Sequence, residues 1–245
     1  MRHAFTLIEL LVTMVILGIL ATLTLSGWHS YLSVATRAKC SNNLRQLSSA
    51  VALYLGDHNN YFPAYLEYGP NGSRKWYFGN ETTPAGTSEG NRNLEISGGP
   101  LYPYIQTVGG IEVCQGFDYG SALWKPKFKG ASYGYGYNWV LGGCSGGQPM
   151  NASQVGGAGV MLFGDCGQVN TFQKPASPKK PMVEEFYLIN ETDKTVHFRH
   201  NNKANILFVD GHVEVYEPYP GTEDRRVKGE LFGRITPVGS TKFLK

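Results

Sequence analysis

The longest hydrophobic pattern lies near the N-terminus, where an almost unbroken apolar run extends from Leu10 to Leu25. With the residues from Phe5 onward it reaches about 20 residues, and a helix of that length crosses a hydrocarbon layer of about 30 Å. The pattern therefore predicts a transmembrane or assembly segment over residues 5–25.

The basic residues beside this segment predict its orientation. Arg2 precedes the apolar run, and the next basic side chains, Arg37 and Lys39, come well after it. Because positive charge is enriched on the cytoplasmic side of a membrane segment, we expect a short cytoplasmic N-terminus and a head outside the cytoplasm.

A second pattern continues the helix from Trp28 to Leu55, where apolar residues recur every three or four positions, as on one face of an amphipathic helix. We expect this face to pack on a head domain. Its residues are Tyr31, Val34, Ala38, Leu44, Leu47, Val51, Tyr54 and Leu55. The solvated face is predicted to carry Arg37, Lys39, Asn42, Asn43 and Arg45. Gly56 and the polar residues after it predict the stop, so the helix should span residues 5–55, or roughly 75 Å.

Composition changes beyond residue 60, where many of the 31 glycines and the Tyr, Pro and Asn residues gather and no long helical period survives. The predicted fold class is therefore α+β, with a long N-terminal helix on a β-rich, loop-rich head over residues 56–245. The Gly-rich tract 69–99 predicts long surface loops. Candidate strands are 110–113, 132–141 and 159–163.

Three tyrosines alternate in one of these strands. Tyr133, Tyr135 and Tyr137 fall on one face of an extended segment. They are interpreted as core or sheet-face residues, and the alternative is a sugar-stacking platform that would include Trp139.

The clearest local structure is a hairpin over residues 204–217. Two β-rich runs flank Asp210 and Gly211, and Asp-Gly between apolar runs is typical of a type I′ turn. The first run is apolar on both faces and should be buried, whereas Val213 and Val215 alternate with Glu214, so the second should be half exposed.

Glu9 is the anomaly of the apolar run, because an ionisable group there costs roughly 3 kcal/mol on insertion scales and is a functional-site candidate. One explanation is a carboxylate that reaches the nearby interface. The other supplies a partner: cleavage between Ala4 and Phe5 would free an amine, and Glu9 of one subunit would neutralise that amine on its neighbour.

Residues Ala4 to Glu9, Ala-Phe-Thr-Leu-Ile-Glu, followed by the apolar run, resemble the class III signal of type IV prepilins and type II secretion pseudopilins. The resemblance implies a leader over residues 1–4, cleavage by a prepilin peptidase and N-methylation of Phe5. It implies as partners the inner membrane and other pilin or pseudopilin subunits. Ala4 departs from the usual Gly, and Ser26 stands where a helix-bending Pro is often found.

The spacing His200-x9-Asp210-Gly211 resembles the C-terminal motif of a pilin-like bacterial family named for it. Together with His197 and His212, His200 and Asp210 could gather a metal or a general base near one end of the hairpin. The structural interpretation, which we favour, has Asp210 forming the turn and His200 bonded to nearby backbone, because no nucleophile or carboxylate pair accompanies them. No metal and no catalytic residue is therefore assigned.

Four cysteines remain, at Cys40, Cys114, Cys144 and Cys166, and an extracytoplasmic compartment permits disulfides among them. Four cysteines allow three full pairings, and the sequence does not choose. Asp118 and Asp165 offer carboxylates to Ca²⁺, as in some secretion pseudopilins, although the spacing of a loop site is not visible.

Charge says little about nucleic acid, since the net charge is +3 and the basic residues are dispersed. We expect a solvated surface and no nucleic-acid partner, and the alternative is a groove for DNA uptake. The leading interpretation is a non-enzymatic structural subunit of a pilus-like or secretion filament. The alternatives are a membrane-tethered or filament-tip glycan-binding adhesion module that uses the tyrosine strand, and a hydrolase that uses His200 and Asp210.

Overall fold

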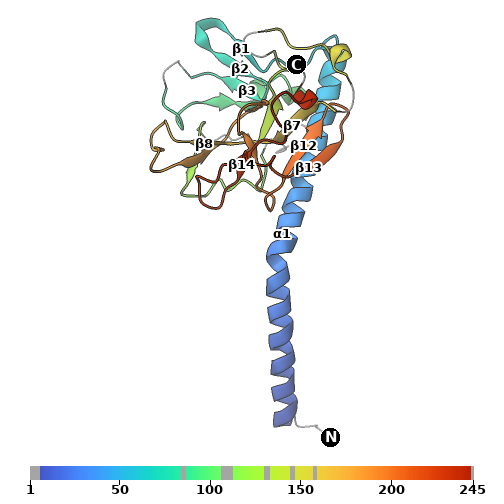
Figure 1. Cartoon of the computed structure of the whole chain (residues 1–245), viewed down its shortest axis with the longest axis vertical. Helices are drawn as coiled ribbons and strands as arrows, with labels where there is room; N and C mark the ends of the chain where they lie inside the picture. The colour runs from blue at the N-terminus through green and yellow to red at the C-terminus, as the bar shows by residue number, and fades with distance from the viewer. Residues whose placement is uncertain are drawn as a thin grey trace.

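A computed structural model describes residues 6–83, 87–105, 113–129, 133–143, 147–156 and 159–243, with the side chains of residues 24–33 and 71 left aside. Helix α1, Leu7–Asp57, has 51 residues and ends two residues beyond the predicted stop. Figure 1 shows its N-terminal half projecting away from the head as a free rod, while its C-terminal half lies along the head. The α+β class is confirmed.

Docking of α1 on the head begins later than the apolar pattern predicts. Val34 is 55% exposed and Ala38 is exposed, whereas burial begins at Cys40. Leu55, predicted on the packed face, is only half-buried. The buried face comprises Cys40, Leu44, Leu47, Ala50, Val51 and Tyr54. Asn43, expected on the solvated face, is buried too, because its amide donates to the Tyr135 hydroxyl at 3.3 Å and to the carbonyl of Val113 at 3.4 Å.

Within the described part of the chain, no helix is long and apolar enough to cross a membrane.

The central sheet has five strands in the order β10-β6-β7-β12-β13. The β10–β6 pair is parallel and the other pairs are antiparallel. Helix α1 packs against β12 and β13, as Figure 1 shows, so the sheet carries the stem on this face. The bounds are β6 Tyr135–Asn138, β7 Met161–Asp165, β10 Leu188–Ile189, β12 Ala204–Phe208 and β13 Val213–Tyr216. The candidate strands 132–141 and 159–163 correspond to β6 and β7.

The alternating tyrosines belong to the core. Tyr133 is 3% exposed, and Tyr135 and Tyr137 are fully buried. Gly136 between them is needed for packing, since a Cβ there would lie 2.5 Å from the Cys166 sulfur. The core interpretation is confirmed, and the sugar-stacking platform on these three tyrosines is wrong.

The hairpin over residues 204–217 is confirmed, with β12 entirely buried and β13 partly exposed. Its turn is not type I′, because only Gly211 has a positive φ, at 91°. Instead, the Gly211 N–H donates to the carbonyl of Phe208, as in a type I turn followed by a bulge. The type I′ geometry occurs at Asn201 and Asn202, with φ of 56° and 60°, and His200 and Lys203 exchange backbone hydrogen bonds around them.

The Gly-rich tract 69–99 is more ordered than the prediction of long loops. It contributes three strands to a four-stranded sheet in the order β1-β2-β3-β4, and Trp76, Tyr77 and Phe78 enter the core. These aromatic residues anchor the tract, which composition alone does not indicate. The bounds are β1 Leu66–Tyr68, β2 Arg74–Trp76, β3 Gly79–Glu81 and β4 Leu94–Glu95.

Two smaller sheets complete the head, in the orders β5-β9-β8 and β11-β14. Their strands are β5 Trp124–Lys125, β8 Gln168–Asn170, β9 Met182–Glu184, β11 Val196–His197 and β14 Phe232–Gly233. Short helices are α2 Tyr102–Ile105, η1 Pro70–Gly72, η2 Ile96–Gly98, η4 Ala152–Gln154 and η5 Thr241–Phe243. The candidate strand 110–113 lies almost wholly outside the described residues.

Candidate assembly segment and buried motif

The N-terminus of α1 is closed by Glu9 and Thr6. The Glu9 carboxylate accepts the Thr6 backbone N–H at 2.8 Å and the Thr6 hydroxyl at 2.7 Å, while the Glu9 N–H donates to the Thr6 hydroxyl oxygen at 3.3 Å. This reciprocal pair is a capping box, and the spacing Thr6-x-x-Glu9 is its sequence signal, which our sequence analysis did not use.

The capping box places the Glu9 carboxylate beside the position where processing would act. It bonds the backbone nitrogen of Thr6, the residue that follows Phe5. Ala4 and Phe5 themselves lie outside the described residues. The carboxylate is thus bonded one residue after the predicted cleavage site, on an exposed helix end.

Beyond this cap, the first turns of α1 expose apolar side chains on all sides. Leu7 is 82% exposed, Ile8 70% and Leu23 64%. A helix that is apolar all round is stable only when other apolar groups cover it. The segment Leu7–Leu23 is called the exposed apolar segment below. Its large exposed side chains are Leu7, Ile8, Leu10, Leu11, Val12, Met14, Val15, Ile16, Leu17, Ile19, Leu20 and Leu23.

His200 lies in the interior, at the type I′ turn that precedes β12. Its Nε2 is 3.3 Å from Oδ2 of Asp165 on β7 and 3.5 Å from the sulfur of Cys114. Asp165 also accepts from the backbone and side-chain N–H groups of Asn205, at 2.7 and 3.1 Å. His200 therefore fastens the turn to β7, where our sequence analysis expected only a bond to nearby backbone.

Arg199 supplies the charge that balances Asp165. Its guanidinium donates to the carbonyls of Gly134 and Cys166 at 2.7 and 2.8 Å, and its Nε is 4.0 Å from the Asp165 carboxylate. Burial opposes ionisation of Asp165, but Arg199 and the hydrogen bond from His200 outweigh it and hold the pKa of Asp165 below its ordinary value. The side chains of Asp165, Arg199 and His200 are all buried, and this cluster, called the internal clamp below, fastens the turn before β12 to β7.

Asp210 and Gly211 lie at the other end of β12, in the turn to β13. Asp210 accepts the N–H of His212 at 3.2 Å and its imidazole at 2.5 Å, so it forms the turn as the structural interpretation expects. The strand separates Asp210 from His200. The alternative that His197, His200, Asp210 and His212 gather at one hairpin end is therefore wrong.

His197 has its own partners. It is buried, stacks on Phe232 at 4.1 Å and bonds the Glu230 carboxylate at 2.6 Å. Burial lowers its pKa to about 4. It is therefore neutral at pH 7 and packs as an aromatic residue.

The structure settles one of the possible disulfide pairings of the four cysteines. Cys40 on α1 and Cys114 form a disulfide with Cα atoms 5.6 Å apart, and Cys166 is free and buried. Cys144 lies outside the described residues. The disulfide ties the stem to the head where the stem begins to dock.

Metal ligands are gathered at one place among the described residues, namely Cys40, Cys114 and His200. Both cysteines are in the disulfide, so their sulfurs are not the thiolates that metals bind. Asp165 is held by Asn205 and His200, and the exposed Asp118 accepts from the N–H of Gly120 at 3.0 Å. These two carboxylates do not assemble the Ca²⁺ site considered from the sequence.

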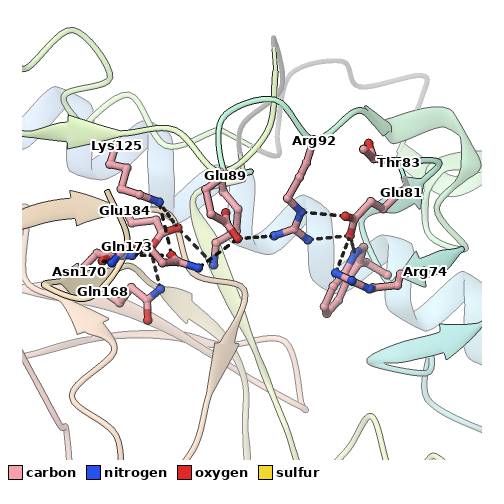
Figure 2. A network of polar contacts seen from close by, with 12 residues as sticks. Arg74, Glu81, Thr83, Glu89, Arg92, Lys125, Gln168, Asn170, Gln173 and Glu184 are labelled. Atoms are coloured by element: carbon pink, nitrogen blue, oxygen red, sulfur yellow. Dashed lines mark hydrogen bonds and ion pairs between the residues drawn. The ribbon is translucent and has the colours of Figure 1, made fainter. Parts of the chain in front are cut away.

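Buried ion pairs without a local sequence signal join the β1-β2-β3-β4 sheet to the β5-β9-β8 sheet (Figure 2). The Glu81 carboxylate on β3 accepts hydrogen bonds from Nε and Nη2 of Arg92, at 2.7 and 2.6 Å. It also accepts the indole N–H of Trp76 at 3.0 Å. Arg92 also pairs with the Glu89 carboxylate at 3.0 Å. In Figure 2, Glu89 lies between Arg92 and Glu184 of the β5-β9-β8 sheet.

Glu184 is the centre of the second half of this network. Lys125 lies 3.1 Å from it and Lys127 3.6 Å, and the amides of Gln168 and Asn170 donate to its other oxygen. The carboxylates of Glu81 and Glu184 are both paired with cationic side chains and accept further side-chain hydrogen bonds, which is typical of a structural network. The next residue, Glu185, is also buried, and burial raises its pKa to about 8.

Comparison with known proteins bears on the N-terminus. A family model described as the prokaryotic N-terminal methylation motif matches residues 1–25. No curated protein and no solved structure matches the chain. The prepilin-type signal is thus supported independently of our interpretation.

Proposed function

We propose that this chain is a structural subunit of a filament of the type IV pilus or type II secretion kind. In this proposal a prepilin peptidase cuts between Ala4 and Phe5 and methylates the new amine. The subunit is first held at the bacterial inner membrane with its head outside the cytoplasm, and then joins other pilin or pseudopilin subunits.

One observation carries the proposal: the methylation motif coincides with the exposed apolar segment, which projects from a folded head. An apolar surface of this kind needs a cover. Lipid provides it before assembly, and the same segments of neighbouring subunits provide it in a filament. The hydrophilic head then faces outward.

Glu9 has a defined role in this proposal. In the free chain its carboxylate bonds Thr6 of its own helix. In the filament it would pair with the amine of Phe5 on a neighbour and set the axial register. The exposure of Glu9 and its position at the first turn support this exchange of partners.

We further propose that the chain is not an enzyme and belongs with the H-x9-DG group of pilin-like proteins. The separation of His200 from Asp210 and the engagement of both in structural bonds support a non-catalytic motif.

The test is intact and N-terminal mass spectrometry of the chain expressed with and without a prepilin peptidase. The expected mature species begins at N-methylated Phe5 and appears only with the peptidase. A chain that keeps Met1 in both cases, or one cut near residue 21, would remove the basis of the filament proposal.

A further inference from the structure

A groove opens at the C-terminal end of α1, between the end of the helix, strand β1, Trp139, Gly143 and residues 147–149. Its volume is about 1020 Å³, at the upper end of the range for small-molecule sites. In Figure 1, β1 lies at the far end of the molecule from the N-terminus. The groove is therefore remote from the exposed apolar segment and stays open when that segment is covered.

Aromatic rings dominate the walls of the groove. Tyr68 is 76% exposed and Tyr61 49%, so both rings are open to a ligand. Tyr65 and Trp139 form a half-buried wall with ring centroids 6.5 Å apart, and Trp76 holds Tyr65 edge-on at 5.7 Å. These rings are flat apolar surfaces that are already in place before a ligand arrives.

The polar groups of the groove are acids and amides. Asp57 and Glu67 are exposed there, together with Asn59 and Gln148. Asp57 is held in position by the Tyr104 hydroxyl, which donates to it at 2.9 Å. None of the described lining residues is Lys or Arg, so the groove repels anionic ligands.

The indole N–H of Trp139 lies beneath the surface of this wall. It is shielded from solvent and has no acceptor among the described residues. Trp139 therefore contributes its ring, and not a hydrogen-bond donor, to the groove.

We propose that this groove binds uncharged polysaccharide. The C–H faces of pyranose rings would stack on the tyrosine and tryptophan rings, and the sugar hydroxyls would donate to the carboxylates and bond the amides. This binding goes beyond the proposed structural function, because filament assembly uses the other end of α1. It also differs from the tyrosine platform considered from the sequence, since of those residues only Trp139 lines the groove.

The test is isothermal titration calorimetry on the full chain in a sugar-free zwitterionic detergent, because alkyl glycoside detergents carry the proposed ligand. The probes are cellohexaose, chitohexaose and maltohexaose, with a galacturonate hexamer as anionic control and pentalysine as cationic control. We expect saturable binding of at least one neutral hexasaccharide and none of the galacturonate hexamer. The absence of binding by all three neutral sugars, or binding of pentalysine alone, would overturn the proposal.

Two variants locate the binding. Tyr68→Ala and Tyr61→Ala remove exposed rings and should each raise the Kd about tenfold, as expected for the loss of one stacking partner. Tyr219→Ala, which removes a tyrosine that is 39% exposed elsewhere on the head, is the matched control and should bind as the wild type does. An equal Kd for all of these proteins would contradict a site in the groove.

The same variants separate this proposal from the filament proposal. Tyr68→Ala should be cleaved at Phe5 and assembled normally. Failure of processing in the wild type would remove the filament proposal and leave sugar binding unaffected, whereas a silent titration with normal processing would remove only the groove.

Discussion

Asp165 shows how much of the head depends on single buried side chains. It is fully buried on β7 and joins His200, Arg199 and Asn205, which come from the turn before β12 and from β12 itself. The His200 of the motif thus contributes to stability through a partner 35 positions earlier in the chain.

Asp165→Asn should lower the free energy of unfolding by about 3–5 kcal/mol, because Arg199 would then be buried without its counter-charge. Urea unfolding followed by tryptophan fluorescence measures this loss. Asp118→Asn, at an exposed carboxylate, is the control and should change stability by no more than about 0.5 kcal/mol. Equal midpoints for the two variants would contradict the clamp.

Glu9→Ala should be processed to Phe5 but lose most of its filament yield, because the neighbour's amine would lack its carboxylate partner. Filament yield is measured by shearing and immunoblotting. Glu217→Ala, at a side chain that is 72% exposed, should assemble normally.

Thr6→Val separates capping from assembly. It removes the hydroxyl of the capping box at a local cost of about 1 kcal/mol and keeps the Glu9 carboxylate. Assembly of Thr6→Val should therefore persist, and a defect equal to that of Glu9→Ala would mean that Glu9 acts only as a cap.

At the scale of elements, α1 is one helix with two environments. Its exposed apolar segment projects away from the head in Figure 1, whereas Leu44 and Leu47 are fully buried against the head. Assembly and head stability should therefore respond to different substitutions along the same helix.

The double variant Leu10→Ser and Leu17→Ser should abolish assembly and leave the thermal midpoint of the head unchanged, because both side chains are well exposed in the free chain. Leu44→Ala should do the reverse and cost about 2–5 kcal/mol of head stability through the cavity that it leaves. Circular dichroism of the detergent-solubilised chain gives both midpoints. A destabilised head in the double variant would show that the two halves are coupled.

The elements predicted from the sequence are those with local signals. The docked stripe from Leu44 to Tyr54 follows helical periodicity, and the hairpin over residues 204–217 follows from two β-rich runs. The predicted turn type was wrong because Asp-Gly also fits a type I turn followed by a bulge, in which only Gly211 needs a positive φ.

Other errors came from contacts that no local pattern encodes. The order of the tract 69–99 depends on Trp76 entering the core and on Arg92 reaching Glu81. Burial of Asn43 depends on Tyr135, 92 positions later in the sequence. The capping box of Thr6 and Glu9, by contrast, was readable from its spacing.

At the scale of the whole molecule, two buried groups tie stability to pH in opposite directions. Burial raises the pKa of Glu185 from 4.5 to about 8, so between these values the folded chain holds a proton that the unfolded chain has released. Stability from this group therefore falls as pH rises from 4.5 to 8. His197, with its pKa lowered from 6.5 to about 4, makes stability fall as pH drops through that range.

Glu185→Gln should remove the alkaline loss, because the amide resembles the protonated carboxyl and never ionises. The variant should gain thermal stability over the wild type at pH 8, by several degrees, and differ much less at pH 5. Glu223→Gln, at an exposed acid, is the control. A gain that is the same at pH 5 and pH 8 would show that ionisation of Glu185 is not the cause.

The disulfide between Cys40 and Cys114 also determines how the molecule carries load. Cys40 lies at the N-terminal edge of the docked face, between the free rod and the buried residues Leu44 and Leu47. A pull on the stem, such as extraction from a membrane or tension along a filament, reaches this covalent bond before it reaches the non-covalent contacts. The stem therefore cannot be peeled from the head turn by turn, and the head moves with the helix as one mechanical unit.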